Sequence, residues 1–560
     1  MQAAAVETLT TRMRDGISLA GDLYQPSGDA VRRPAILVRT PYGKEGYRDD
    51  ALVRKAVERG YAVFVQDVRG RYASQGVFDP YRQDGRDGFD TVEWIAAQPW
   101  SNGRVGGRGL SYPGAAQWLT AVEAPPHLVC IFPAMCFSSG RQFFTFGGAW
   151  DMSWIPWTAN NIAPDERRRR GLPGPKTGRE ARELWLREGQ RALRHVPLNT
   201  LPLLQGVAGF YFEWLDHPDD GGFWDFADIE SKHAQVRVPA FNFSGWHDEG
   251  YGPIGAARNF SGMRRHGATD AARQPRLVIG PWTHGEPTPA STKVGDVDFG
   301  AAAGLDYDAL VLDWCDLHLR GIDRGLAAQP PVRVFVMGAN TWRESREWPL
   351  PGTTPRALHL RAGGRLTWDA PAANEAGDAY VFDPNDPVED PHYDAGLGPH
   401  DQRALERRAD VLVFTSDPLP DDLEVIGHIE TRLWIASSAP DTDFYARLLD
   451  VDEAGAAWNL MSPTLEVIRA RYRHDEAAPE PLVPGQPYEL VLRWGMTGNL
   501  FRRGHRIRLH VTSSFFPHLD RNPNTGRPVP NEGTLAPARQ HVFHDASRPS
   551  RVILPVTGGA

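Results

Sequence analysis

The first third of the chain alternates short apolar runs with stretches whose apolar residues recur at helical spacing. Such runs, bounded by polar turns, predict buried strands, and the intervening stretches predict helices. The predicted strands are residues 35–38, 61–66, 240–244 and 276–279, and the predicted helices are residues 51–59, 84–98 and 306–320. Asp84 stands at the N-cap position of the second helix. Strands that alternate with helices predict a parallel sheet covered on both faces.

A stretch of different character, residues 139–233, interrupts this alternation. It is rich in Trp and Arg, and residues 179–195 have the periodicity of an amphipathic helix. Its position inside an α/β pattern predicts a helical cap inserted into the α/β domain. The α/β domain is then expected at residues 1–138 and 234–330.

After residue 331 the pattern changes to apolar and polar positions that alternate with a period of two. Ile507, Leu509 and Val511, for example, are separated by polar residues, as in a strand with one buried face. Similar strands are predicted at residues 430–436, 444–451, 464–472, 488–494 and 551–556. Many strands with few helices predict an all-β sandwich of the jelly-roll type for residues 331–560. We expect this domain to pack on the other two parts.

Composition and charge narrow the function classes. The 560 residues are 41% apolar and 23% charged, as in a globular chain. Lys and Arg number 61 against 70 Asp and Glu, a net charge of −9, which argues against nucleic acid as a partner. No run of 18 apolar residues occurs, so we expect no contact with a membrane.

The cysteines give a weak indication of compartment. Cys130, Cys136 and Cys315 are the three in the sequence, and their spacing fits neither a disulfide framework nor a zinc motif. We expect buried, reduced thiols and a cytoplasmic location. The first residues lack the basic and apolar stretches of a signal peptide, and a leader removed before this numbering stays open.

The strongest local signal for chemistry is the segment GRGLSYPG at residues 107–114, which precedes a helix-forming run. A Ser between glycines at a strand-to-helix turn is typical of a nucleophile elbow, in which the hydroxyl is exposed above the sheet. The usual pattern is G-x-S-x-G, but here Pro113 stands in the second glycine position and Gly114 follows one residue late. Ser111 is therefore the predicted nucleophile, with a plain glycine-rich turn as the alternative.

A serine nucleophile needs a base, and the base needs an orienting carboxylate. In an elbow-type hydrolase these follow in the order Ser, Asp or Glu, His, each after a strand. Asp248 comes just past the predicted strand 240–244, and His284 just past the strand 276–279. His247 is the rival base, but a histidine adjacent to Asp248 could not easily donate a hydrogen bond to it.

The chain resembles the cocaine esterase and X-prolyl dipeptidyl-peptidase (CocE/NonD) family of serine hydrolases, which includes α-amino-acid ester hydrolases and glutaryl-cephalosporin acylases. The matching segments follow in the family's order along nearly the whole chain. They are residues 13–16, 39–44, 66–71, 109–114, 244–248, 280–284, 414–419 and 439–444. In this family the late glycine of the elbow is usual.

The resemblance implies an α/β-hydrolase domain with an inserted helical cap, followed by a C-terminal jelly roll. It implies Ser111 as nucleophile, His284 as base and Asp248 as its orienter. It also implies an oxyanion hole made by the Tyr42 hydroxyl and the backbone N–H of Tyr112. The sequence fits this, because it lacks the HGGG-type loop that other hydrolases use.

The predicted function is cleavage of an ester or amide of a small molecule through an acyl-enzyme. No metal or organic cofactor is expected, because HExxH, phosphate-binding loops and paired Cys/His ligands are absent from the sequence. A homodimer stays open. The alternatives are an X-prolyl dipeptidyl peptidase, a β-lactam side-chain acylase, and a jelly-roll binding protein with a vestigial triad.

Aromatic residues are the candidates for the walls of the acyl pocket. The candidates are Phe143, Phe144, Trp150, Trp154 and Trp157 at the start of the cap, and Trp246 beside the predicted acid. The extra carboxylates with which α-amino-acid ester hydrolases hold an ammonium group are not visible as a full cluster after Asp248.

Overall fold

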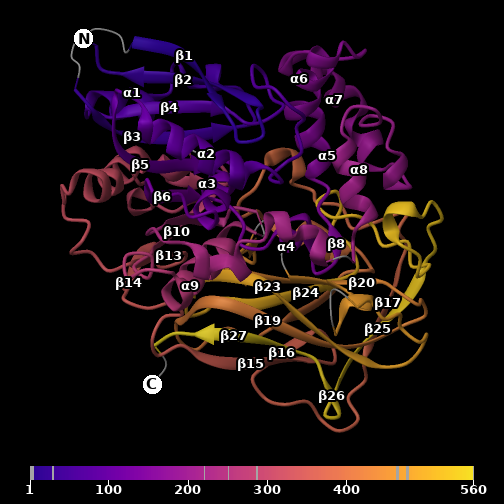
Figure 1. Cartoon of the computed structure of the whole chain (residues 1–560). Coiled ribbons are helices and arrows are strands. Elements are labelled where there is room, and N and C mark those ends of the chain that lie inside the picture. The colour runs from indigo at the N-terminus through magenta and orange to yellow at the C-terminus, as the bar shows by residue number, and fades with distance from the viewer. Residues whose placement is uncertain are drawn as a thin grey trace.

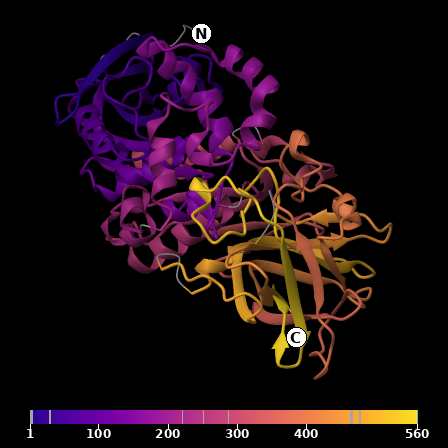
Figure 2. The same ribbon diagram turned by 90° about the vertical axis from the view of Figure 1, so that its right-hand side faces the viewer.

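The computed structural model of the protein describes residues 5–27, 31–219, 221–249, 251–285, 288–461, 466–474 and 478–558. Three parts follow one another in Figure 1: an indigo and magenta sheet domain, a group of purple helices beside it, and orange and yellow strands below both. Seen from the side in Figure 2, the orange and yellow strands form a separate lower body.

The first sheet has ten strands among the described residues, in the order β1-β2-β4-β3-β5-β6-β9-β10-β13-β14. Neighbours from β4 to β13 run parallel, and antiparallel pairing adds β2 and then β1 at one end of the sheet and β14 at the other. Their bounds are β1 Ala5–Arg12, β2 Ser18–Gln25, β3 Arg33–Thr40, β4 Ala62–Asp67, β5 Ser101–Leu110, β6 Leu128–Ala134, β9 Phe241–His247, β10 Arg276–Thr283, β13 Val332–Val336 and β14 Thr341–Ser345.

Helices cover this sheet on both faces, as the pattern of apolar runs predicts. Helices α2 (Asp84–Ala97) and α3 (Tyr112–Val122) share a core with one face, and α1 (Ala51–Glu58) and α10 (Tyr307–Cys315) share a core with the other. Strand β4 is buried at every position, because a parallel strand between two helical layers has no solvent-facing side. The prediction of an α/β-hydrolase fold is confirmed.

Two details differ from the sequence-based expectations. Strands β13 and β14 extend the first sheet past residue 330, where the C-terminal domain was expected to begin; the hydrogen bonds of β13 to β10 decide this. Asp84 does not cap α2. Its carboxylate instead accepts a hydrogen bond from the Tyr112 hydroxyl at 2.6 Å and lies 3.2 Å from the Arg39 guanidinium.

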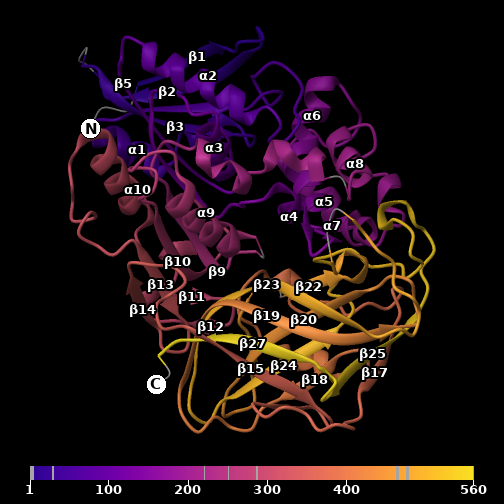
Figure 3. The same cartoon turned by 60° about the horizontal axis from the view of Figure 1, so that its bottom comes forward.

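The helical cap lies between β6 and β9. Its helices are α4 Gly140–Phe144, α5 Trp154–Trp157, α6 Ala163–Arg170, α7 Gly178–Leu193 and α8 Gly209–Asp216. Helix α7 confirms the predicted amphipathic helix, and Thr177 and Glu180 form a capping box at its start. Figure 3 shows the cap beside the sheet domain and above the C-terminal strands. The outer limits of the cap at residues 139 and 233 stay predictions.

The C-terminal domain is all-β, as expected. Its bounds are β15 Thr354–Arg361, β16 Arg365–Thr367, β17 Asp378–Phe382, β18 Leu412–Thr415, β19 Leu423–Ser437, β20 Asp443–Val451, β21 Ala457–Asn459, β22 Glu466–Arg469, β23 Tyr488–Phe501, β24 Arg506–Thr512, β25 Ala538–Asp545, β26 Arg548–Pro549 and β27 Arg551–Val556. Residues 464 and 465 of one predicted strand lie outside the described residues, and the rest of it forms β22 and a 3₁₀ turn. The jelly-roll connection order stays a prediction.

The C-terminal domain packs on both other parts. One apolar core contains residues of β9, β10 and helix α9 (Gly252–His266) together with residues of β19, β20 and β23. The cap is joined by backbone hydrogen bonds between Trp150 and Asp520 and between Met152 and His518, each of 2.9 Å. The end of β9, which carries the predicted acid, is therefore supported from outside its own domain.

Two further expectations can be compared with the structure. Cys130, Cys136 and Cys315 are free and buried, as predicted. Among the described residues, no helix combines the length and the apolar character that crossing a bilayer requires.

Candidate active site

Ser111 occupies a sharp turn between β5 and α3, at the carboxyl end of the parallel strands. Its backbone has φ 64° and ψ −126°, an uncommon conformation for a residue with a side chain. The Ser111 N–H donates to the Ala134 carbonyl at the end of β6, at 2.9 Å, which ties the turn to the sheet. A strained serine between a strand and a helix is the geometry expected of a nucleophile elbow.

The late glycine of this turn has a steric cause. A Cβ built on Gly114 would lie 2.6 Å from the Ala134 carbonyl oxygen, so a side chain at residue 114 would push α3 off β6. Pro113 lies in the first turn of α3, where a proline is tolerated because the first N–H groups of a helix lack intrahelical partners. The requirement for glycine thus falls on residue 114 rather than residue 113.

Asp248 and His284 meet at the same edge of the sheet. The Nδ1 of His284 lies 2.6 Å from Oδ1 of Asp248, and the Ser244 hydroxyl donates to the other carboxylate oxygen, Oδ2, at 2.6 Å. Asp248 is fully buried, whereas His284 is half-buried and faces the cavity described below. Both oxygens of the carboxylate are therefore hydrogen-bonded, and Nδ1 of His284 faces the carboxylate. The other ring nitrogen, Nε2, is left to act on a substrate.

The carboxylate also sets the acidity of the histidine. Burial by itself lowers the pKa of His284, but the charge and hydrogen bond of Asp248, with the charge of Glu249, outweigh it and raise the pKa to about 9. The rival histidine behaves differently. His247 is fully buried outside the described cavity lining, and burial followed by the charge of His400 lowers its pKa to about 3.

Tyr42 faces the same site from the loop after β3. Its hydroxyl accepts a hydrogen bond of 3.1 Å from the indole N–H of Trp157, a residue of the cap helix α5. Burial raises the pKa of Tyr42 to about 12, although the hydrogen bonds with Trp157 and Ser111 act in the opposite direction. The hydroxyl therefore keeps its proton at neutral pH and can donate it in a hydrogen bond.

The predicted role of Tyr112 belongs to its backbone N–H, and its side chain is turned away from the cavity. The phenol is buried, donates to Asp84 at 2.6 Å and accepts from the Tyr81 N–H at 3.0 Å. Its amide is the first of helix α3, among the N–H groups that intrahelical bonds leave free for an anion.

A cavity of about 410 Å³ joins these groups. Six of its eleven lining residues are Phe, Tyr or Trp, and the other five are polar. Its lining residues are Tyr42, Tyr81, Ser111, Phe143, Ser153, Trp154, Trp157, Asn161, Glu249, Tyr251 and His284. Three of the predicted wall residues therefore line the cavity: Phe143, Trp154 and Trp157.

Three of the predicted wall residues lie elsewhere. Phe144 and Trp150 are buried in the aromatic core of the cap, where Phe144 packs on Trp214 and Trp224 with ring centroids 4.4 and 4.6 Å apart. Trp246 points to the C-terminal domain, and its indole N–H donates to the Phe335 carbonyl at 2.6 Å. For Phe144 it is the neighbouring Phe143 that faces the cavity instead.

Five lining residues were absent from the predicted pocket: Tyr81, Ser153, Asn161, Glu249 and Tyr251. Glu249 and Tyr251 could have been found, because they follow Asp248 almost directly. Glu249 has φ 30°, a strained conformation, and lies near a second carboxylate. Burial, followed by the charge of Glu249, raises the pKa of that second group, Asp151, to about 7.

Comparison with known proteins agrees with this arrangement. Residues 15–286 match the family model of X-Pro dipeptidyl-peptidase (S15 family), and residues 324–553 match that of the X-Pro dipeptidyl-peptidase C-terminal non-catalytic domain. Cocaine esterase of Rhodococcus sp. (strain MB1 Bresler) is 34% identical over 97% of both chains.

Solved structures extend the likeness to the whole fold. An α-amino acid ester hydrolase superimposes with a TM-score of 0.81 at 25% identity, covering 99% of this chain and 97% of that chain. A CocE/NonD family hydrolase from Staphylococcus aureus, 18% identical, gives a TM-score of 0.71 over 99% and 94% of the chains, which supports the fold alone. The chain therefore belongs to the cocaine esterase and X-prolyl dipeptidyl-peptidase (CocE/NonD) family and is a serine hydrolase.

Proposed function

We propose that this serine hydrolase cleaves an ester of a small molecule through an acyl-enzyme on Ser111. The observation that carries the proposal is the convergence of Ser111, Tyr42 and an Asp248-bound His284 on one cavity. A nucleophile, a base held by a buried carboxylate and a donor for an oxyanion are the groups that acyl transfer requires.

The proposed mechanism assigns a residue of the cavity to each step of acyl transfer. Ser111 Oγ attacks the ester carbonyl and its proton passes to Nε2 of His284. The oxyanion that forms accepts hydrogen bonds from the Tyr42 hydroxyl and the Tyr112 amide. The imidazolium then gives its proton to the leaving alkoxide as the ester C–O bond breaks. Water attacks the acyl-enzyme, His284 takes the proton of the water, and Ser111 leaves with that proton as the acid is released.

The cavity favours an apolar acyl or alcohol group of modest size. Its volume of about 410 Å³ lies in the lower part of the usual range for small-molecule sites, and Phe143, Trp154 and Trp157 present apolar surface. Membership of an enzyme family, together with the complete set of acyl-transfer groups, speaks against the alternative of a binding protein with a vestigial triad.

One observation favours a second candidate, an X-prolyl dipeptidyl peptidase or an acylase for amine-bearing substrates. Glu249 places a carboxylate on the cavity wall, and Asp151 lies close enough for the two charges to interact. A carboxylate at this place could hold a substrate ammonium group. Hydrolysis of p-nitrophenyl butyrate and of Gly-Pro-p-nitroanilide separates the two candidates. Glu249→Gln should reduce turnover of the second substrate far more than that of the first, measured at the pH optimum of the variant.

The proposed nucleophile is tested by Ser111→Ala. We expect this variant to fold and to lose p-nitrophenyl ester hydrolysis by a factor of about 10⁶, as triad serines do elsewhere. A fluorophosphonate probe should label the wild-type protein at Ser111 and leave the variant unlabelled. Ser153→Ala, which changes another serine of the same cavity, is the matched control and should keep both properties. Labelling of Ser111→Ala at wild-type rate would overturn the assignment.

A further inference from the structure

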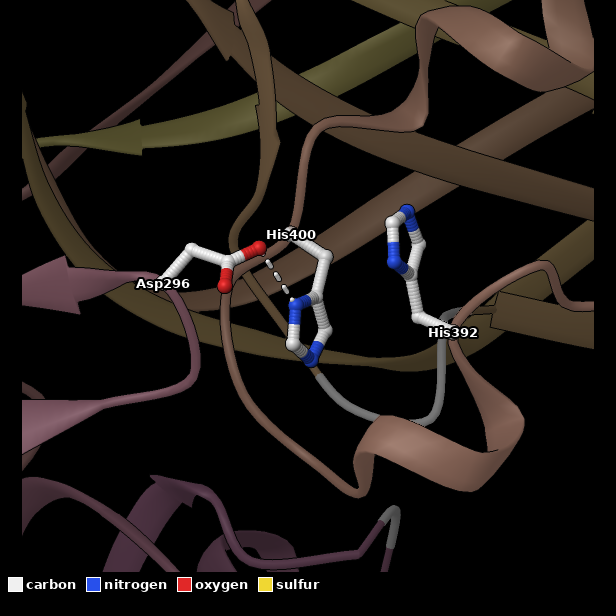
Figure 4. A group of neighbouring side chains, drawn as sticks. All are labelled: Asp296, His392 and His400. Carbon is white, nitrogen blue, oxygen red and sulfur yellow. Dashed lines mark hydrogen bonds and ion pairs between the residues drawn. The ribbon is translucent and has the colours of Figure 1, made fainter.

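A second group of chemically active side chains lies outside the proposed active site. Asp296 is in the turn between β11 (Lys293–Val294) and β12 (Val297–Asp298), and His392 and His400 come from the C-terminal domain. Figure 4 shows the three side chains side by side. One ring nitrogen of each histidine and one carboxylate oxygen of Asp296 lie within 4.8 Å of one another. His400 is buried, His392 half-buried and Asp296 exposed.

The hydrogen bonds of the two imidazoles determine which nitrogens are free to bind. Nε2 of His392 lies 3.1 Å from the Asp401 carbonyl, and Nε2 of His400 lies 3.0 Å from the Gly396 carbonyl. A carbonyl oxygen only accepts, so each Nε2 carries a proton. In the neutral rings the lone pair is then on Nδ1, and a bond from Nε2–H to a backbone carbonyl is the usual support of a metal-binding histidine.

The contact between His400 and Asp296 brings together two of the three candidate ligand atoms. Nδ1 of His400 is 2.8 Å from Oδ2 of Asp296. With the proton of His400 on Nε2, this would place a lone pair against a carboxylate oxygen. A metal ion bound by both atoms would replace this direct contact. Nδ1 of His392 lies nearby and offers a metal ion a third ligand atom.

We propose that Asp296, His392 and His400 bind a divalent transition-metal ion of the Zn²⁺ type. Two imidazole nitrogens and one carboxylate are a common ligand set for Zn²⁺ and leave a fourth position for water. Their positions in the sequence, 296, 392 and 400, match no metal motif, which is why the sequence predicted no metal.

Binding requires a defined local movement. The rings of His392 and His400 are stacked, with centroids 4.6 Å apart and planes 8° from parallel, whereas a bound ion lies in the plane of each of its imidazoles. The ring of His392 therefore turns out of the stack on loading. Tetrahedral Zn²⁺ ligands are about 3.3 Å apart, given bonds of about 2.0–2.1 Å. A pair at the 4.8 Å limit would therefore close by about 1.5 Å, and the His400–Asp296 pair, at 2.8 Å, would open by about 0.5 Å.

An ion bound at this site would link the β11–β12 hairpin to the C-terminal domain. The backbones already touch there, since the Asp296 N–H donates to the Pro399 carbonyl at 3.0 Å. His400 is also near enough to His247, the neighbour of Asp248, to affect its ionisation. A metal ion at this place would therefore stabilise the contact between the hairpin and the C-terminal domain.

Titration of the chelator-treated full-length protein with ZnCl₂ tests the proposal by calorimetry and by thermal unfolding. We expect one ion per chain and, at 100-fold excess over Kd, a rise of about 2–5 °C in Tm. His392→Ala, which leaves the His400–Asp296 pair intact, should weaken binding by more than about 100-fold and abolish the Tm rise. Asp296→Asn, at an exposed position, should do the same.

The matched control is His505→Ala. His505 also forms a histidine–carboxylate pair in the C-terminal domain, with Nδ1 2.8 Å from Asp450, and Asp296, His392 and His400 remain intact in this variant. It should bind Zn²⁺ as the wild-type protein does. Equal Zn²⁺ affinity in wild-type protein and His392→Ala, or no binding to either, would overturn the proposal.

Discussion

At the scale of single residues, the charge of Asp248 determines, in the proposed mechanism, when His284 can act as a base. Only the neutral imidazole accepts the proton of Ser111, so activity must rise with pH as His284 loses its proton. Because Asp248 and Glu249 raise the pKa of His284 to about 9, the rising limb of kcat/KM should lie above pH 6.5, the ordinary value for histidine. A pH profile of p-nitrophenyl ester hydrolysis measures this limb.

The variant Asp248→Asn separates the charge from the geometry. Without the carboxylate charge, burial should move the limb to lower pH, and kcat should fall by about 10⁴, as in other triads. The Ser153→Ala variant serves as the control and should keep the wild-type limb. A wild-type limb at or below pH 6.5 would contradict the raised pKa.

The residue scale also shows what could be predicted locally. The positions of Ser111, Asp248 and His284 follow from chain order, because each comes directly after a strand whose apolar run is visible in the sequence. The choice between Trp157 and Trp150 as pocket wall could not be predicted. Both are tryptophans of the cap in similar sequence surroundings, and only the packing of the folded chain decides which one faces the cavity.

At the scale of elements, the short helix α5 connects the cap to the proposed oxyanion hole. An indole N–H only donates, so the Tyr42 oxygen accepts from Trp157 and its own proton is left to point toward Ser111 or a substrate. Trp157→Phe should therefore lower kcat by about tenfold, the value of one hydrogen bond, with a smaller change in KM. Steady-state kinetics with p-nitrophenyl esters provides both constants.

A double-mutant cycle tests whether Trp157 acts through Tyr42. Tyr42→Phe alone should cost about 10²–10³ in kcat. In that background Trp157→Phe should add little, because the acceptor of its hydrogen bond is gone. Trp154→Phe, which changes another tryptophan of the cavity wall, is the control and should have additive effects with Tyr42→Phe. If the losses in kcat of Trp157→Phe and Tyr42→Phe were additive, Trp157 would have no role in positioning Tyr42.

At the scale of the whole molecule, the catalytic and C-terminal domains share one core. Gly498 of β23 lies against Trp246, and a Cβ there would be 2.6 Å from the indole and 2.9 Å from the Phe335 carbonyl oxygen. Gly498→Val should therefore destabilise the protein by about 1–3 kcal/mol. It should also lower kcat, because Trp246 is two residues from Asp248.

Thermal unfolding together with ester kinetics measures both effects. Arg493→Val, at an exposed position of the same strand, introduces the same side chain without the clash and should leave Tm and kcat nearly unchanged. If Gly498→Val lowered Tm but left kcat at the wild-type value, the C-terminal domain would support stability alone and not the position of Asp248.

The sequence by itself determined the α/β and all-β parts, the inserted cap, and the order of Ser111, Asp248 and His284. Periodicity and turn chemistry are local properties, so they are visible along the chain. Only the tertiary structure decided that β13 and β14 join the first sheet, that Trp157 contacts Tyr42, and that Asp296 meets His392 and His400. These contacts join segments far apart in the chain, and side-chain direction and burial arise only when such segments pack together.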